Sequence, residues 1–284
     1  MISKIFITTF LFFLCYGLFL KLPLIQNKNA PQNMWQENMV KMQNYIYTNN
    51  KAQHIILGSS LSMGITPLNE NYYNLSAGGG NPFAGLEILK QTKNNSQKIY
   101  IEINYLLTKS AADDKYLGSL FMPILHDLRS YLPAMREKHQ PFSLIGFYFQ
   151  TKILKNIFSS NGRSGLDHTK EKRLAMFKED YKDSIAIKHT VAENLLKLNI
   201  YYSYFKKKGV EMIFYEMPID CSLENDPLPV YCRDKILAFC TLHHTIFIPF
   251  DDCATYNTVD GNHLDESSTL VYKNYFYSRI HPLK

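Results

Sequence analysis

Short apolar runs that end in turn residues alternate along this chain with longer segments of helical periodicity. The runs are rich in β-branched and aromatic side chains, which favours buried strands over helices. The expected strands lie at residues 54–58, 72–75, 98–103, 210–216 and 244–249, and the expected helices at residues 83–94, 190–208 and 266–279. Strands that alternate with helices build parallel sheets covered by helices. The pattern predicts an α/β domain whose functional loops follow the carboxyl ends of the strands.

The N-terminus carries the most apolar segment of the sequence. Residues 5–20 contain no charge, follow Lys4 and continue past Lys21 into further apolar residues, so the segment is long enough to span a bilayer with some tilt. No small-residue cleavage pattern follows it. We therefore expect residues 1–25 to be an uncleaved signal anchor, a single transmembrane helix in the inner (cytoplasmic) membrane, with the rest of the chain facing the periplasm or the cell exterior.

Beyond this anchor we expect one large domain. Residues 26–50 are rich in Asn and Gln and are interpreted as a tether followed by an amphipathic helix. Residues 51–284 are sufficient for a single α/β domain with a substantial core. Within it, residues 105–190 mix aromatic and basic side chains and are interrupted by prolines and by an Asn-Gly turn at 161–165, which indicates a helical insertion. The insertion either caps the functional loops or completes the core.

The charge of the chain is modest. Its formal net charge of +6 suits an anionic lipid or polymer nearby, and because no nucleic-acid-binding motif accompanies it, we expect no DNA or RNA partner. No cofactor and no metal ion are expected.

Four of the five cysteines lie in the last quarter of the chain. An even number of cysteines outside the cytoplasm suggests two disulfides among Cys221, Cys232, Cys240 and Cys253. Pairing Cys221 with Cys232 and Cys240 with Cys253 would close a proline-rich loop, but the two other pairings are equally permitted. A zinc site is the rival interpretation, although no Cys-x-x-Cys spacing is present. Free thiols would be expected in a reducing compartment.

A serine follows the first expected strand at a sharp turn. In Gly58-Ser59-Ser60-Leu61 the Ser60 hydroxyl would lie at the carboxyl edge of the sheet, at the start of the next helix. A serine hydroxyl needs a base within hydrogen-bond reach to act as a nucleophile. The best candidate is His263, with Asp260 three residues earlier to orient it. A serine that merely caps a helix is the simpler alternative.

Three groups could stabilise an oxyanion beside Ser60. The Ser60 amide would contribute one donor, and the glycine run after the second expected strand could aim the Gly79 amide at the same place, with Gly78 or Gly80 as alternatives by a one-residue slip. Asn104 ends the third expected strand and could donate from its side chain. Together with Ser60, His263 and Asp260, these donors would suit acyl transfer.

These four segments resemble the SGNH (GDSL-like) hydrolase superfamily, whose four blocks contribute a serine, a glycine, an asparagine and a histidine in the same chain order. By this resemblance Ser60 falls at the nucleophile, Gly79 and Asn104 at the oxyanion positions, and Asp260 and His263 at the closing Asp-x-x-His. The resemblance covers residues 54–107 and 210–279. It implies a flavodoxin-like three-layer α/β/α fold with a parallel sheet.

Two of the four blocks depart from the family pattern. Ser59 stands where the first block normally has Asp, and the third block reads Glu102-Ile103-Asn104-Tyr105 where simple esterases of the family tend to have Gly-x-Asn-Asp. Such variants resemble the membrane-anchored members that modify cell-envelope polymers.

The resemblance implies an extracytoplasmic serine esterase or O-acyltransferase that acts on acyl esters, with acetyl as the expected group, of an envelope polysaccharide or glycolipid. Because one span cannot carry acyl donors across the membrane, a transferase would need a multi-spanning acyltransferase partner. The alternative is a non-catalytic accessory protein that binds glycan or docks a membrane O-acyltransferase, and a soluble lipase is a third interpretation.

Overall fold

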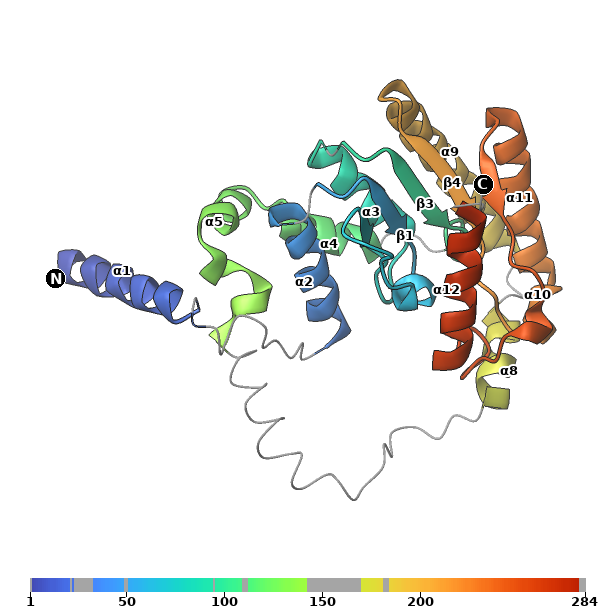
Figure 1. The fold of residues 1–284 in the computed structure, drawn as a ribbon, viewed down its shortest axis with the longest axis horizontal. Coiled ribbons are helices and arrows are strands. Elements are labelled where there is room, and N and C mark those ends of the chain that lie inside the picture. The colour runs from blue at the N-terminus through green and yellow to red at the C-terminus, as the bar shows by residue number, and fades with distance from the viewer. Residues whose placement is uncertain are drawn as a thin grey trace, which may run out of the picture. The chain divides into compact units, whose positions relative to one another are not determined.

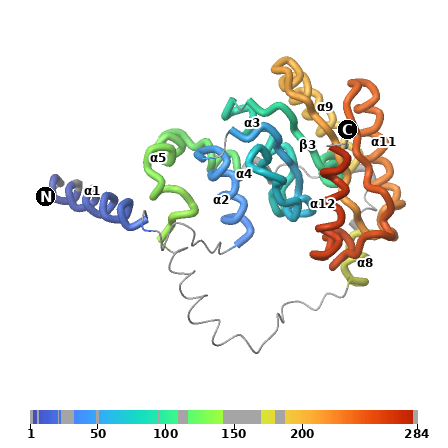
Figure 2. Tube along the Cα trace, viewed as in Figure 1, coloured from blue at the N-terminus to red at the C-terminus, as the bar shows by residue number. Residues whose placement is uncertain are grey.

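The chain is described here by a computed structural model that covers residues 2–20, 22, 33–48, 51–93, 95–108, 112–141, 170–180 and 184–280, drawn in colour in Figures 1 and 2. It divides into two compact units, residues 1–48 with 118–166 and residues 49–117 with 167–284. The expected tether before residue 33 and the expected turn at 161–165 lie outside the described residues.

The second unit contains a parallel sheet with strand order β2-β1-β3-β4-β5 (Figure 1). Its strands are β1 (His54–Leu57), β2 (Tyr72–Asn74), β3 (Lys98–Glu102), β4 (Glu211–Tyr215) and β5 (Ile246–Ile248). The predicted α/β class with a parallel sheet is confirmed, and each strand overlaps an expected one. This order is that of flavodoxin-like sheets, in which ligands bind at the carboxyl ends of β1 and β3, where the order reverses.

Helices cover both faces of the sheet. They are α3 (Pro82–Gln91), α9 (Ser184–Lys207) and α11 (Pro227–His243) on one face and α12 (Glu266–Ile280) on the other. The alternation of side chains along a strand explains this division. In β4, Phe214 contacts Phe239 of α11, whereas the next residue, Tyr215, contacts Phe276 of α12, with ring centroids 5.7 and 4.9 Å apart. Both faces are thus built from aromatic and aliphatic contacts.

Several short elements lie along the chain between the strands and the longer helices. These are the 3₁₀ helices η1 (Leu61–Gly64) and η5 (Cys253–Thr255) and the helices α4 (Ala112–Leu120), α8 (Lys170–Asp180) and α10 (Cys221–Glu224). The helix expected directly after Ser60 is the short 3₁₀ helix η1, with Ser60 at its N-cap position. The expected start of the last strand at residue 244 is wrong, since His244 is the left-handed cap of α11, with φ of 54°.

The first unit is helical in its described part. It contains α1 (Ile2–Phe19), α2 (Met34–Tyr47), α5 (Leu125–Tyr131), η2 (Pro133–Met135) and η3 (Glu137–His139). Asn33 caps α2 by accepting a hydrogen bond from the Gln36 amide at 2.9 Å, and α2 is tied to η3 by a 2.8 Å hydrogen bond from the Glu137 amide to Gln43. Within the described residues, no helix combines the length and apolar character needed to cross a membrane.

One disulfide joins Cys221 to Cys253, with their Cα atoms 5.3 Å apart. The expectation of two disulfides is wrong, because Cys232 and Cys240 are free and buried. Both lie on α11, where eight residues of helix separate them by about 12 Å. A disulfide needs Cα atoms less than about 7 Å apart, so the helix itself prevents this pair from bonding. The rival interpretation of these cysteines as a zinc site does not apply to Cys221 and Cys253, because sulfur atoms joined in a disulfide are not thiolate ligands.

Candidate functional site

Ser60 lies in the turn between β1 and η1, at the carboxyl edge of the sheet. Its side chain is half-buried, while the neighbouring Ser59 is fully buried. The turn requires Gly58, because a Cβ atom at that position would lie 2.5 Å from Glu102 Oε2 and 2.6 Å from Ser62 Oγ. The side chains of Glu102 and Ser62 pack closely against this backbone. Ser59 is enclosed by the fold, and Ser60 is the serine of the turn that is partly exposed.

His263 joins Ser60 to Asp260. His263 Nε2 lies 2.8 Å from Ser60 Oγ, and His263 Nδ1 lies 2.8 Å from Asp260 Oδ2. An ionised carboxylate can only accept hydrogen bonds, so Nδ1 carries the proton that is donated to Asp260. Nε2 is then free to accept the Ser60 hydroxyl proton. The structure thus brings together the three residues that the sequence analysis named.

Asp260 is held as a carboxylate by its neighbours. Burial alone would raise its pKa, but hydrogen bonds from the His263 side chain and from the amides of His263 and Asn262 hold the pKa of Asp260 well below its usual range. The two amides donate to Oδ1 at 2.8 and 3.0 Å, which leaves Oδ2 for the imidazole. Oδ2 also accepts a hydrogen bond from Arg173 of α8 at 2.9 Å.

The loop that carries Asp260 and His263 is a tight turn. The Val259 amide donates to the His263 carbonyl at 2.8 Å, and Thr258 forms an antiparallel bridge with Leu264. Gly261 adopts a φ of +99°, and a Cβ there would lie 2.5 Å from Leu174 of α8. The positive φ favours glycine at this position, and a larger residue would also have to displace the end of the Leu174 side chain.

Two further connections fix this loop to the segment that follows β4. The Asp220 amide donates to the Gly261 carbonyl at 2.8 Å, and the next residue, Cys221, forms the disulfide with Cys253. Lys170 of α8 pairs with the Asp220 carboxylate at 2.7 Å. Burial would raise the pKa of Asp220, but hydrogen bonds from Lys170 and Ser222 lower it to about 2. One face of α8 therefore holds both acidic groups of this region.

The backbone geometry distinguishes among the candidate glycines. The Gly80 amide donates to the Ala77 carbonyl at 3.0 Å and is thus occupied within the turn. Gly79 is exposed and has a φ of +67°. In the described part of the chain neither its amide nor the Ser60 amide has an acceptor, so both remain available to a ligand.

The orientation of the Asn104 side chain is fixed by Met217. Asn104 Oδ1 accepts from the Met217 amide and Nδ2 donates to the Met217 carbonyl, both at 2.8 Å. This pairing assigns the oxygen and nitrogen of the amide without ambiguity and uses only one of the two Nδ2 hydrogens. Among the described residues, the second hydrogen has no acceptor, so Asn104 retains one N–H for a ligand.

The loops at this edge are also connected to one another. Asn81 caps α3 and donates to the carbonyls of Tyr105 and Leu106 at 3.3 and 3.2 Å, which joins the β2 loop to the β3 loop. Asn262 donates to the Tyr105 hydroxyl at 2.6 Å, which joins the histidine loop to the β3 loop. The groups at the edge of the sheet therefore form one connected network.

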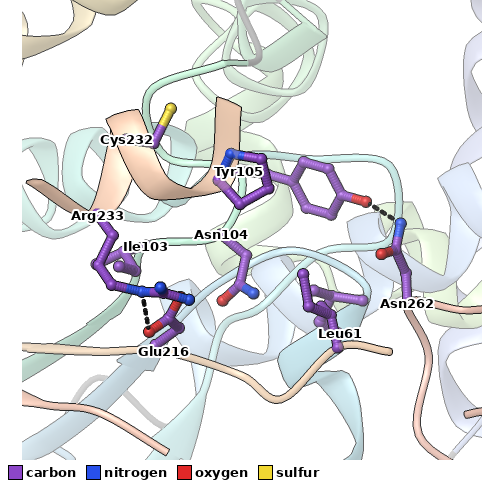
Figure 3. A pocket seen from close by; sticks show the side chains of 10 residues that line it. Leu61, Ile103, Asn104, Tyr105, Glu216, Cys232, Arg233 and Asn262 are labelled. Atoms are coloured by element: carbon purple, nitrogen blue, oxygen red, sulfur yellow. Dashed lines mark hydrogen bonds and ion pairs between the residues drawn. The ribbon is translucent and has the colours of Figure 1, made fainter. Parts of the chain in front are cut away.

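A small cavity of about 30 Å³ lies beside this network (Figure 3). Figure 3 shows the Asn104 amide between Leu61 and an ion pair of Arg233 with Glu216. Arg233 Nε lies 2.9 Å from both carboxylate oxygens of Glu216. The other lining residues come from the same loops and from α11, namely Ile103, Tyr105, Ile219, Pro229, Cys232 and Asn262.

Sequence reasoning missed several residues of this site. Glu102 was noted only as a departure from a pattern, yet it is fully buried beneath the Ser60 turn. Arg173 lay in the expected insertion with no sign that it would reach Asp260. Asn81 had a local signal, because Asn before Pro82 is typical of a helix start, but its contacts with the β3 loop depend on the tertiary fold.

No group of residues that could hold a metal ion occurs in the described part of the chain. No protein-family model matches the sequence, and no curated protein sequence matches it. Among solved structures, the chain is similar to a "putative acylhydrolase" from Bacteroides fragilis NCTC 9343, with 11% sequence identity and a TM-score of 0.42 over 85% of this chain and 96% of that one. A structural similarity this weak supports no conclusion about function. The functional argument therefore depends on the geometry of the site.

Proposed function

We propose that this chain is a serine esterase or O-acyltransferase of SGNH type, in which Ser60 is the nucleophile and His263 and Asp260 complete a catalytic triad. The observation that carries the proposal is the continuous chain of 2.8 Å contacts from Ser60 Oγ through His263 to Asp260. Ser60 lies 203 residues before His263, whereas Asp260 and His263 are three residues apart on one loop. The fold brings them into the arrangement that general-base activation of a serine requires.

The reaction follows from the positions of the protons. His263 Nε2 takes the Ser60 proton while Oγ attacks the ester carbonyl, and the resulting oxyanion would accept hydrogen bonds from the Ser60 amide, the Gly79 amide and Asn104 Nδ2. When the tetrahedral intermediate collapses, the imidazolium returns the proton to the leaving alkoxide and an acyl-Ser60 ester remains. Water or a sugar hydroxyl then attacks this ester by the same route, which gives hydrolysis or transfer.

We propose acetyl as the acyl group, which the family resemblance implies. A small cavity lies beside Asn104, one of the proposed oxyanion donors, and we propose that it receives the acyl chain. Varying the length of the acyl chain tests this role of the cavity.

We further propose that the domain works outside the cytoplasm on acetyl esters of an envelope polysaccharide or glycolipid. The Cys221–Cys253 disulfide supports an oxidising compartment. Attachment to the inner membrane through residues 1–25, and delivery of acyl groups by a multi-spanning partner, are proposals from the sequence. Retention of the full-length chain in membranes after alkaline carbonate washing, with its N-terminus intact, would support the attachment, and recovery of a shortened soluble chain would contradict it.

The experiment that tests the activity uses a serine-reactive fluorophosphonate and 4-nitrophenyl acetate on the full-length protein. We expect one covalent adduct on Ser60, located by peptide mass spectrometry, and turnover of the acetate that Ser60→Ala and His263→Ala each abolish. Combining the two substitutions should cost little more, because residues that act as a unit are not additive. An adduct on Ser59 would show that the nucleophile was assigned to the wrong serine.

The same experiment separates the proposed enzyme from the accessory alternative. A binding protein that keeps the fold would show neither adduct nor turnover. Because Ser60 is partly exposed, the absence of an adduct would indicate a hydroxyl that is not activated. Ser267→Ala is the matched control, because Ser267 is an exposed serine whose hydroxyl contacts only Asp265 at 2.8 Å. That variant should label and turn over like the unmodified protein.

A further inference from the structure

Glu102 is a fully buried carboxylate directly beneath the turn that carries Ser60. It ends β3 and has no exposed surface. Its carboxylate accepts the Ser59 amide at 2.8 Å and the Ser59 hydroxyl at 2.8 and 3.0 Å. It also accepts the Ser62 hydroxyl at 2.6 Å. The residue on one side of Ser60 and the residue two positions beyond it are thus bound to the same group.

The direction of each hydrogen bond is determined by the neighbours. The Tyr215 hydroxyl donates to Ser62 Oγ at 2.7 Å, so the Ser62 proton is left for Glu102. The Leu61 amide donates to Ser59 Oγ at 3.2 Å, which similarly leaves the Ser59 proton for Glu102. Ser59 and Ser62 therefore both present hydrogens to the Glu102 side chain, and an ionised carboxylate is a group that accepts them.

We propose that Glu102 is the positioning residue of the nucleophile: it holds the turn from Ser59 to Ser62 so that Ser60 Oγ stays in line with His263 Nε2. This inference rests on the proposed function, because it assigns a role in the same reaction. Glu102 acts on Ser60 through Ser59 and Ser62, which lie before and after it in the turn. Both carboxylate oxygens accept from the Ser59 hydroxyl, so Gln at this position would keep one acceptor oxygen and place an amide nitrogen beside Ser59.

The geometry also connects the two departures from the family pattern. Ser59 Oγ lies within 3.0 Å of both Glu102 oxygens, so a carboxylate carried by residue 59 would occupy much of the space that the Glu102 carboxylate now fills. Ser59 in place of Asp and Glu102 in place of Gly are therefore one exchange, in which the carboxylate beneath the turn is supplied by β3 instead of by the turn itself.

The test measures three variants of the full-length protein by the rate of fluorophosphonate labelling at Ser60 and by kcat and KM for 4-nitrophenyl acetate. Glu102→Gln keeps the volume and should lower the labelling rate and kcat about 100-fold, the loss typical of a misplaced reacting group, with KM nearly unchanged. Glu102→Ala should lose more. The double variant Ser59→Asp with Glu102→Ala should recover at least tenfold over Glu102→Ala.

The control is Glu87→Gln, which changes a partly buried, hydrogen-bonded carboxylate elsewhere in the domain. Glu87 accepts from the Tyr201 hydroxyl at 2.6 Å on α3, outside the site, so this variant should label like the unmodified protein. A Glu102→Gln variant with unchanged kcat would overturn the inference. A double variant that is no more reactive than Glu102→Ala would also overturn the inference, because the proposed exchange requires a carboxylate at residue 59 to take over the role of Glu102.

Amide hydrogen exchange keeps this test separate from that of the proposed function. If the unmodified protein shows no labelling and no turnover, the esterase proposal fails, whereas the positioning claim is still decided by exchange in peptides that cover Ser59 to Ser62. We expect Glu102→Gln to increase exchange there at least tenfold, and the double variant to reduce it again. Unchanged exchange in Glu102→Gln would refute the positioning role whatever the activity.

Discussion

Replacing Arg173 by Gln should shift the pH dependence of the reaction. Arg173 and His263 hydrogen-bond to the same oxygen, Oδ2 of Asp260, at 2.9 and 2.8 Å. During catalysis His263 becomes a cation when it takes the Ser60 proton. The guanidinium opposes this charge and competes for the carboxylate that stabilises it. Arg173→Gln should therefore favour the protonated imidazole, and the acidic limb of the pH profile of kcat/KM should move to higher pH.

The size of the shift follows from the geometry. The two nitrogens that share Oδ2 can be no more than about 6 Å apart, and the Arg173 side chain is 42% exposed, so a water-like dielectric constant applies. Coulomb's law then gives about 0.7 kcal/mol. Because 1.36 kcal/mol corresponds to one pH unit, the acidic limb should move upward by about half a unit at low ionic strength. High salt should reduce the shift, since the pair is partly exposed.

The assay is hydrolysis of 4-nitrophenyl acetate between pH 5 and about 9, with Lys170→Gln as the matched control. Lys170 lies one turn earlier on α8 and pairs with Asp220 at 2.7 Å, so its loss perturbs the same helix without touching the Asp260 carboxylate. Lys170→Gln should move the limb less than Arg173→Gln does. A downward shift, or an equal shift in both variants, would refute the reasoning, because either result would assign the effect to the helix and not to the shared oxygen.

Three other predictions concern the loop, the cavity and the oxyanion. Cys221→Ser should lower the free energy of unfolding by about 3.7 kcal/mol, the chain-entropy value for the 32-residue separation to Cys253, measured by urea denaturation; equal stability with and without reductant in the unmodified protein would contradict it. Cys232→Ala should enlarge the cavity and raise propionate turnover relative to acetate about fourfold, from 0.8 kcal/mol for one additional methylene. Cys240→Ala, which removes a buried thiol that does not line the cavity, should not change this ratio, and the same ratio in both variants would exclude the cavity as the acyl site. Asn104→Ala should lower kcat by about 100-fold, and an unchanged kcat would remove Asn104 from the oxyanion site.

The strands and the order of the functional segments could be predicted because their signals are local. A run such as Ile99-Tyr100-Ile101 indicates a buried strand from its own composition, and parallel strands bring their carboxyl ends to one edge. The turn after Leu57 contains the glycine that close packing requires, and the loop around His263 contains the glycine that its positive φ favours. Placing His263 beside Ser60 also needed the resemblance in the chain order of the four segments.

The supporting residues could not be predicted, because their roles depend on contacts between distant segments. Glu102 reads locally as the end of a strand, and only the approach of β1 places Ser59 and Ser62 over its carboxylate. Arg173 lies 87 residues from Asp260. The prediction of two disulfides was wrong for a related reason. Counting four thiols suggests two bonds, but α11 holds Cys232 and Cys240 apart, and this helix was not among the predicted ones.

The histidine loop is held by interactions that differ in physical character. The Arg173 contact is electrostatic and partly exposed, the close approach of the partly buried Leu174 to Gly261 is apolar, and the Cys221–Cys253 bond is covalent. Two of the three come from α8, which is separated along the chain from both strands that carry the nucleophile and the oxyanion groups. The site is therefore assembled on a rigid sheet on the side of Ser60 and on a clamped loop on the side of His263. Since a triad depends on the distance between these two parts, loosening α8 should affect proton transfer before it affects the fold.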